Sequence, residues 1–175
     1  LLWKSGDGEA GYMTPLPFEI NHQWHAMIAS GKFYHCVDLS TGKVAWKHRW
    51  LTTYGCNAAA PIVSNNRVFL SSGYGRGSTL LEFNQESYKV LWSNKEMQNQ
   101  FNSSLLIDGH LYGFDGDEKG GEEGEAGTGE SSEERLNEAD RVQLKCIDFE
   151  TGKPRWSISG LGSGSLMAAN DRLIV

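Results

Sequence analysis

Residues 36–46 read Cys36-Val37-Asp38-Leu39-Ser40-Thr41-Gly42-Lys43-Val44-Ala45-Trp46, and residues 146–156 read Cys146-Ile147-Asp148-Phe149-Glu150-Thr151-Gly152-Lys153-Pro154-Arg155-Trp156. The two segments share Cys, Asp, Thr-Gly-Lys and Trp at the same positions. Two such occurrences are hard to explain by chance, so the chain contains an internal repeat.

A weaker third copy occupies residues 82–92. It keeps the spacing to Trp92, with Asn84 in place of the aspartate, Ser87 in place of the threonine and Tyr88 in place of the glycine. We expect Tyr88 to take a backbone geometry that glycine adopts more readily.

The tryptophans give the length of the repeat. Trp3, Trp46, Trp92 and Trp156 are separated by 43, 46 and 64 residues. Subtracting an acidic insertion of about 22 residues shortens the last spacing to about 42, which is the length of a four-stranded propeller blade.

The repeated segment predicts a structural role. Its Asp can accept hydrogen bonds from turn amides, and its Thr-Gly pair closes a hairpin with Gly at positive φ. The Trp supplies roughly 150–250 Å² of surface for burial against the neighbouring repeat. The predicted structural residues are Asp38, Thr41, Gly42, Trp46, Asn84, Trp92, Asp148, Thr151, Gly152 and Trp156.

Short strands predict an all-β fold. Turn pairs such as Asn65-Asn66 and Asp108-Gly109 separate apolar runs and indicate tight hairpins. The strands expected in the second period are 59–64, 67–72, 79–84 and 90–95, and those in the third are 103–107, 110–114, 142–149 and 154–159.

Four antiparallel strands per period predict one domain over residues 1–175, a partial β-propeller. We expect about three four-stranded blades, with incomplete blades at both ends: 12–50, 56–97, 101–160 and an incomplete 163–175. Propellers close with about four to eight blades, so both ends are expected to be cut from a longer chain whose remaining blades complete the ring.

Residues 117–140 form an acidic insertion with ten acidic and two basic residues. Its net charge is -8 within a chain whose total is -6, so the rest of the chain carries +2. A segment so polar cannot bury enough apolar surface to offset chain entropy, and we predict that it is disordered.

Composition excludes two classes of protein. The chain has 175 residues, with 16 Lys+Arg against 22 Asp+Glu, and this balance argues against a nucleic-acid binder. No apolar run approaches the roughly 20 residues of a transmembrane helix. Cys36, Cys56 and Cys146 lie far apart, so we expect buried free thiols and neither a disulfide framework nor a zinc site.

Three short patterns resemble ligand sites; a metal or phosphate site is the less favoured interpretation of the first two, and the third is rejected. His22 and His25 have metal-ligand spacing, but on a strand they would point to opposite faces. Gly73 to Gly77 suggests a phosphate loop, but a strand follows it and no Lys-Ser/Thr pair completes it. A calcium loop starting at Asp115 would place Lys119 and Ala126 where carboxylates are required.

Blade topology predicts where a ligand would bind. Connections from second to third strand, and from fourth strand to the next blade, emerge on one face, and loops carry most binding sites. This face is expected to hold 50–57, 73–78, 97–102, the acidic insertion and 160–163. Its polar candidates for ligand contact are Asn57, Arg76, Gln98 and Asn102, although solvated loop residues are the simpler interpretation of each.

The segments at 36–46 and 146–156 resemble the A-x-D-x-x-T-G-K-x-x-W tryptophan-docking motif of pyrroloquinoline-quinone (PQQ)-type propeller repeats, with Cys36 and Cys146 where that family has Ala. The resemblance covers the chain outside the acidic insertion. It implies a bacterial, exported protein, often periplasmic. The family includes quinone-dependent dehydrogenases and non-catalytic scaffolds.

A dehydrogenase of this kind would be expected to carry an adjacent Cys-Cys pair, a Ca²⁺ held by Glu and Asn, and a catalytic Asp. None of these maps onto this chain, so no catalytic, metal-binding or cofactor-binding residue is predicted in it. We therefore expect a binding or scaffolding module for a protein or extracellular ligand. The alternative is a dehydrogenase whose PQQ and calcium are held by missing blades. A WD-type propeller is disfavoured because its Gly-His and Trp-Asp signature is missing.

Overall fold

The computed structural model describes residues 1–6, 8–116 and 142–175, and the acidic insertion predicted at 117–140 lies outside this range. The described residues form fourteen strands and one short 3-10 turn, without an α-helix. The elements are β1 (Leu16–Ile20), β2 (Gln23–Ala29), β3 (Phe33–Asp38), β4 (Val44–Arg49), η1 (Thr53–Gly55), β5 (Ile62–Ser64), β6 (Arg67–Ser72), β7 (Gly77–Phe83), β8 (Tyr88–Asn94), β9 (Leu105–Ile107), β10 (His110–Asp115), β11 (Gln143–Asp148), β12 (Pro154–Ile158), β13 (Met167–Ala169) and β14 (Arg172–Ile174).

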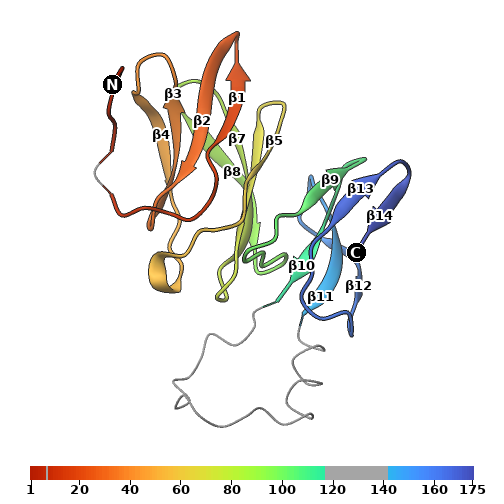
Figure 1. Cartoon of the computed structure of the whole chain (residues 1–175). Helices are drawn as coiled ribbons and strands as arrows, with labels where there is room; N and C mark the ends of the chain where they lie inside the picture. The colour runs from red at the N-terminus through yellow and green to blue at the C-terminus, as the bar shows by residue number, and fades with distance from the viewer. Residues whose placement is uncertain (7, 117–141) are drawn as a thin grey trace, which may run out of the picture.

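Three four-stranded sheets and one two-stranded sheet follow one another along the chain. Strand order is sequential in each: β1-β2-β3-β4, β5-β6-β7-β8, β9-β10-β11-β12 and β13-β14. All strand pairs are antiparallel, and Figure 1 shows the sheets arranged side by side. These are the blades of a partial β-propeller, as the repeat predicted.

The tight turns between first and second strands have the predicted geometry. Asn65, between β5 and β6, has φ 53°, and Asp108 and Gly109, between β9 and β10, have φ 47° and 74°. Asn and Asp tolerate this left-handed region because their short polar side chains bond locally. The hairpins predicted at these two sites are confirmed.

The middle sheet is apolar on both faces because it lies between two others. Along β6, Val68 and Leu70 belong to the core shared with the first sheet, whereas Phe69 belongs to the core shared with the third. On β7, Leu81 and Leu80 divide in the same way. Successive strand residues point to opposite faces, so one strand contributes to two interfaces.

Tryptophan side chains connect each four-stranded sheet to the segment that precedes it. The Nε1 of Trp3 donates to Leu39 O at 2.9 Å, that of Trp46 to Asn84 O at 3.1 Å, and that of Trp92 to Phe149 O at 3.0 Å. In each case the acceptor lies at the hairpin between third and fourth strands of the sheet that the indole contacts. Each bond therefore satisfies an indole donor at an interface between neighbouring segments.

The aspartates of the repeat hold these hairpins. Asp38 Oδ1 accepts hydrogen bonds from the backbone amides of Ser40 at 2.8 Å and Thr41 at 3.3 Å. Asp148 Oδ1 accepts from the Thr151 amide at 2.9 Å. Asp148 Oδ2 also receives a hydrogen bond from Arg155, and this contact, with those from Thr151, lowers its pKa to about 2.

The middle hairpin differs from the expected repeat. Trp92 pairs with Leu80, twelve positions earlier, whereas Trp46 pairs with Cys36 and Trp156 with Cys146, ten positions earlier. The turn at Asn84 is shorter than the other two: its backbone amide donates to Ser87 O, three residues later, whereas the amides of Asp38 and Asp148 donate to Lys43 O and Lys153 O, five residues later. The Asn84 side chain closes the turn by accepting from the amides of Glu86 and Ser87.

The expected glycine-like geometry at Tyr88 was therefore wrong. Tyr88 lies in β8 and pairs with Phe83, outside the turn. With no glycine to take positive φ, the turn is formed by residues 84–87, and the Tyr88 ring instead covers Trp46 at 5.0 Å between centroids.

Candidate binding surface

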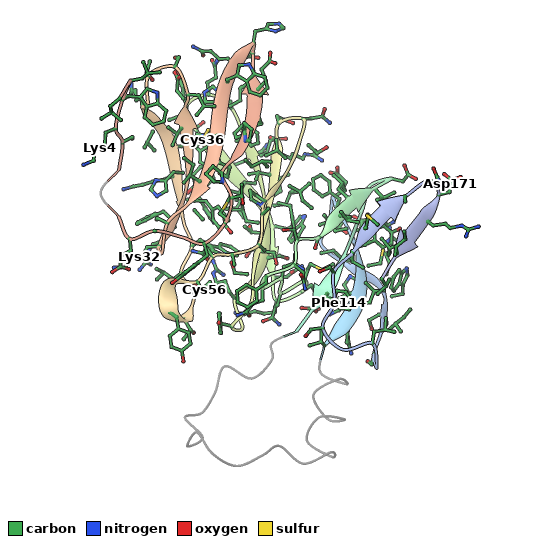
Figure 2. The ribbon with its side chains drawn as sticks, in the orientation of Figure 1. Lys4, Lys32, Cys36, Cys56, Phe114 and Asp171 are labelled. Carbon is green, nitrogen blue, oxygen red and sulfur yellow. The ribbon has the colours of Figure 1, made fainter. Side chains whose placement is uncertain are left out.

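Connections between strands gather at one end of the sheets. We call this the loop end, defined by residues 30–32, 50–61, 73–76, 95–104 and 159–166. Figure 1 shows η1 and the connections that follow β8 and β12 at this end, and in Figure 2 Lys32 and Cys56 lie there, far from Asp171 in the β13–β14 hairpin. Three of the connections touch. The backbones of Gly31 and Gly55 are in close contact, and the rings of Tyr54 and Tyr74 meet edge to face at 5.5 Å.

Arg76 lies over an aromatic ring at the junction of the first two sheets. Its guanidinium carbon is 3.5 Å from the centroid of Trp50, within the range of a cation–π contact. The indole is fully buried, while Arg76 is half-buried. Burial lowers the pKa of Arg76, and burial together with the Arg76 charge lowers the pKa of His48. The ring of His48 lies 5.7 Å from that of Trp50, so a cation and a weakly basic ring share one aromatic surface.

Asn57 lies beneath this contact and is fully buried. Trp50 Nε1 donates to Ser72 Oγ at 3.0 Å, and Ser72 Oγ donates to Asn57 Oδ1 at 3.1 Å. Asn57 Nδ2 donates to Ser30 O at 2.9 Å. Both ends of the Asn57 amide are thus bonded within the protein, in a chain that fixes the indole under Arg76.

Gln98 lies at the next junction, beside a partly buried ion-pair cluster. Its backbone amide donates to Asp115 Oδ1 at 2.6 Å, and Asp115 also pairs with Lys145. Lys145 Nζ lies 2.6 Å from Glu96 Oε2. Burial alone would lower the pKa of Lys145, but its hydrogen bonds to the two carboxylates outweigh that effect and raise it. The cluster joins the middle sheet's outgoing connection to β10 and β11.

Asn102 joins the β8–β9 connection to the β12–β13 connection. Its amide nitrogen donates to Gly164 O, and its Oδ1 accepts from Ser165 Oγ at 3.0 Å. The structure therefore brings Asn57 and Arg76 together through Trp50 and Ser72, and places Gln98 and Asn102 at separate junctions. Ligand contact by any of the four remains a prediction.

Large apolar side chains are exposed in each connection between consecutive sheets. Phe101 is 75% exposed and Tyr54 is 74% exposed, and Leu51 and Leu161 are also exposed. Exposed apolar residues that gather on one face are typical of interaction sites. Sequence reasoning missed them because it searched these loops for polar groups; the available signal was an aromatic or leucine within a Gly-, Ser- and Asn-rich connection.

His22 and His25, whose spacing suggested a metal site, do not come together in the structure. His22 is in the β1–β2 turn with φ 63°, where it bonds Glu19, whereas His25 is buried in β2. No group of three His, Cys, Asp or Glu side chains in the described ranges could hold a metal ion. Cys36 and Cys146 are buried and Cys56 is half-buried, all as free thiols. Within the same residues, no helix is long and apolar enough to cross a membrane.

The fold and the repeated hairpins define a β-propeller module of PQQ-like repeats. The family model described as outer membrane protein assembly factor BamB matches residues 26–132, and the chain belongs to this family. A comparison with curated protein sequences gives no match.

Solved structures share the fold at low identity. BamB from Moraxella catarrhalis is 15% identical with a TM-score of 0.61, over 94% of this chain and 44% of that one. A europium-containing methanol dehydrogenase is 12% identical with a TM-score of 0.53, over 90% and 26%. The quinohemoprotein alcohol dehydrogenase ADHIIG from Pseudomonas putida HK5 is 14% identical with a TM-score of 0.52, over 87% and 22%. The chain spans less than half the length of each.

Proposed function

We propose that this chain is a non-catalytic binding module that presents its loop end to a protein partner. The observation that carries the proposal is the set of exposed apolar side chains at that end, Leu51, Tyr54, Phe101 and Leu161, which come from the three connections between consecutive sheets. Aromatic residues held by a rigid scaffold lose little conformational entropy on binding and are common interface anchors.

The sheets beneath the loop end supply that rigidity. Trp50 is fully buried and bonded to Ser72, and Lys145 is paired with Asp115 and Glu96. Such contacts fix where each connection leaves its sheet. A surface with fixed geometry and protruding apolar groups suits a polypeptide partner better than a small polar substrate.

Membership of the family also supports a protein partner. Its model carries the description of an outer membrane assembly factor, and we propose that this chain likewise works in the periplasm of a bacterium or in another exported compartment, with a protein partner. Fractionation of cells that produce the full-length protein tests the compartment: recovery in the cytosol would contradict it.

Site-specific photo-cross-linking tests the binding surface. Benzoylphenylalanine replaces Tyr54 or Phe101 in the full-length protein, and Asp171, in the hairpin at the opposite end, is the matched control position. We expect cross-links to a defined protein from the two loop-end positions and none from position 171. Equal cross-linking from all three positions, or from position 171 alone, would refute the loop end as the interface.

A PQQ-dependent dehydrogenase is the second candidate, because two of the similar structures are a methanol dehydrogenase and a quinohemoprotein alcohol dehydrogenase. Its cofactor and calcium would then be held by blades outside this chain. Adding PQQ and Ca²⁺ to the full-length protein distinguishes the two candidates. Cofactor absorbance together with dye-linked alcohol or sugar oxidation would establish the dehydrogenase and overturn the non-catalytic proposal.

A further inference from the structure

Arg76 stacks on an aromatic ring that is itself fixed by a hydrogen bond. Its guanidinium lies 3.5 Å from the Trp50 centroid, and the buried indole is fixed by its hydrogen bond to Ser72. The backbone of the same loop is closed by the Arg76 amide, which donates to Gly73 O at 3.1 Å. Stacking of this kind pre-organises the planar guanidinium, so that less freedom is lost when it binds an anion.

The guanidinium of Arg76 has no anionic partner among the residues the structure describes. No carboxylate within those ranges lies at ion-pair distance, and its described interactions are the stacking on Trp50 and the electrostatic effect on His48. Arg67 and Arg155, in contrast, pair with Glu150 and Asp148. The Trp50 ring compensates only part of the hydration that this half-buried cation loses, and an incoming anion would supply the rest.

The surroundings indicate what kind of anion fits. Lys95 Nζ donates to Gly75 O, so a second cation lies next to the Arg76 loop. The edge-to-face pair of Tyr54 and Tyr74 lies at the same junction and supplies apolar surface. One fork-shaped donor matches a single carboxylate in a two-bond arrangement, and the adjoining rings suit apolar neighbours of that carboxylate in a peptide.

We propose that Arg76, stacked on Trp50, is the recognition site for a carboxylate of an acidic segment in the partner protein, flanked there by apolar residues. The inference rests on the proposed function, since the partner must dock at the loop end. The chain as a whole carries a net charge of -6, so general attraction of an acidic peptide is not expected and binding depends on this local site.

The test uses a blocked, fluorescein-labelled hexapeptide with two glutamates between phenylalanines, and a matched peptide with glutamines. Binding to the full-length protein is measured by fluorescence anisotropy. We expect Arg76→Gln to weaken binding of the glutamate peptide at least tenfold and Arg76→Lys to weaken it several-fold, because the ammonium lacks the two-bond fork. Arg172→Gln makes the same charge change at an exposed site on β14 and should alter binding less than twofold. Circular dichroism checks folding, and Arg76→Lys carries the test if the glutamine variant does not fold.

Several outcomes would overturn the proposal. Both Arg76 variants could bind the glutamate peptide as well as the unmodified protein does, or the unmodified protein could bind both peptides equally. Inorganic phosphate could displace the peptide at a much lower concentration than acetate does. The peptide could also bind only after residues 118–138 have been removed. The cross-linking experiment separates this inference from the proposed function. Cross-links from positions 54 and 101 together with equal binding of the two peptides would refute only the carboxylate site. Absence of cross-links from both positions in protein that keeps Arg76 would refute the interface itself.

Discussion

Gly152, in the hairpin between β11 and β12, packs directly against the indole of Trp92 on β8. A Cβ at residue 152 would lie 2.7 Å from the indole of Trp92, closer than side-chain carbons approach one another, and Gly152 has φ 67°. Gly42 meets Trp3 in the same way, with φ 74° and a distance of 2.6 Å. The glycine of the repeated segment therefore has two tasks, to turn the chain and to leave room for an indole from the preceding segment.

Replacing Gly152 by Ala should be more destabilising than a positive φ alone explains. The left-handed backbone costs about 1–2 kcal/mol, and overpacking against the indole adds about 1–3 kcal/mol. Gly109 is the matched control, because it has φ 74° but nothing within 4 Å of a Cβ. Urea unfolding should show a loss of about 1 kcal/mol for Gly109→Ala and a clearly larger one for Gly152→Ala. Equal losses would mean that the indole moves aside freely.

Trp46 and Trp156 should differ in their contribution to stability although they occupy the same position in the repeat. Trp46 is buried and donates to Asn84 O, whereas Trp156 is 40% exposed. We expect Trp46→Ala to lower the free energy of unfolding by about 3–5 kcal/mol and Trp156→Ala by less than half of that. Thermal and urea unfolding of this chain measure both, and a larger loss from Trp156→Ala would contradict the interface described above.

The ion-pair cluster at the loop end predicts a coupled pair of substitutions. Lys145→Met removes the cation and leaves Asp115 buried without its partner, which should cost about 3 kcal/mol. Adding Asp115→Asn removes the unpaired charge and keeps an acceptor for the Gln98 amide, so the double variant should regain stability. A double-mutant cycle by urea unfolding measures the coupling. Additive losses would show that the two side chains do not interact.

Asp148 predicts a pH dependence of stability. Its pKa is lowered from about 3.8 to about 2, chiefly by hydrogen bonds from Arg155 and Thr151. A carboxylate with a lowered folded-state pKa stabilises the fold above its unfolded pKa, and this contribution is lost as the pH falls from about 4 to about 2. Asp148→Asn should therefore reduce the drop in melting temperature over this interval, while Asp171→Asn, at an exposed turn, should not. An NMR titration that places the Asp148 carboxyl near pH 4 would contradict the prediction.

Deleting residues 118–138 should leave thermal stability nearly unchanged. The sequence from 117 to 140 contains ten acidic residues and almost no apolar side chain, so it has little surface to bury. Lengthening or shortening such a loop changes closure entropy only slightly. A drop of several degrees in melting temperature would show that the segment contributes packing.

The repeat, the strands and the hairpin turns could be predicted from sequence because they depend on local chemistry. Asp38 and Asp148 bond amides within three residues, and Asn65 and Asp108 turn the chain by their own backbone preference. The apolar alternation of β6 is equally local. These features established an all-β chain of about three blades without any knowledge of which segments touch.

The middle hairpin and the loop end were decided by tertiary structure. The pairing of Trp92 with Leu80 depends on where the shorter turn at Asn84 lets the strands meet, and the spacing of residues in the sequence cannot show this. Asn57 was predicted to be a loop residue available to ligands, yet it is fully buried because Trp50 and Ser72 from two different sheets converge on it. Arg76 acquires its orientation from that same convergence. Contacts between segments far apart in the chain form only when the blades pack, and packing decides which polar groups are covered and which remain available to a partner.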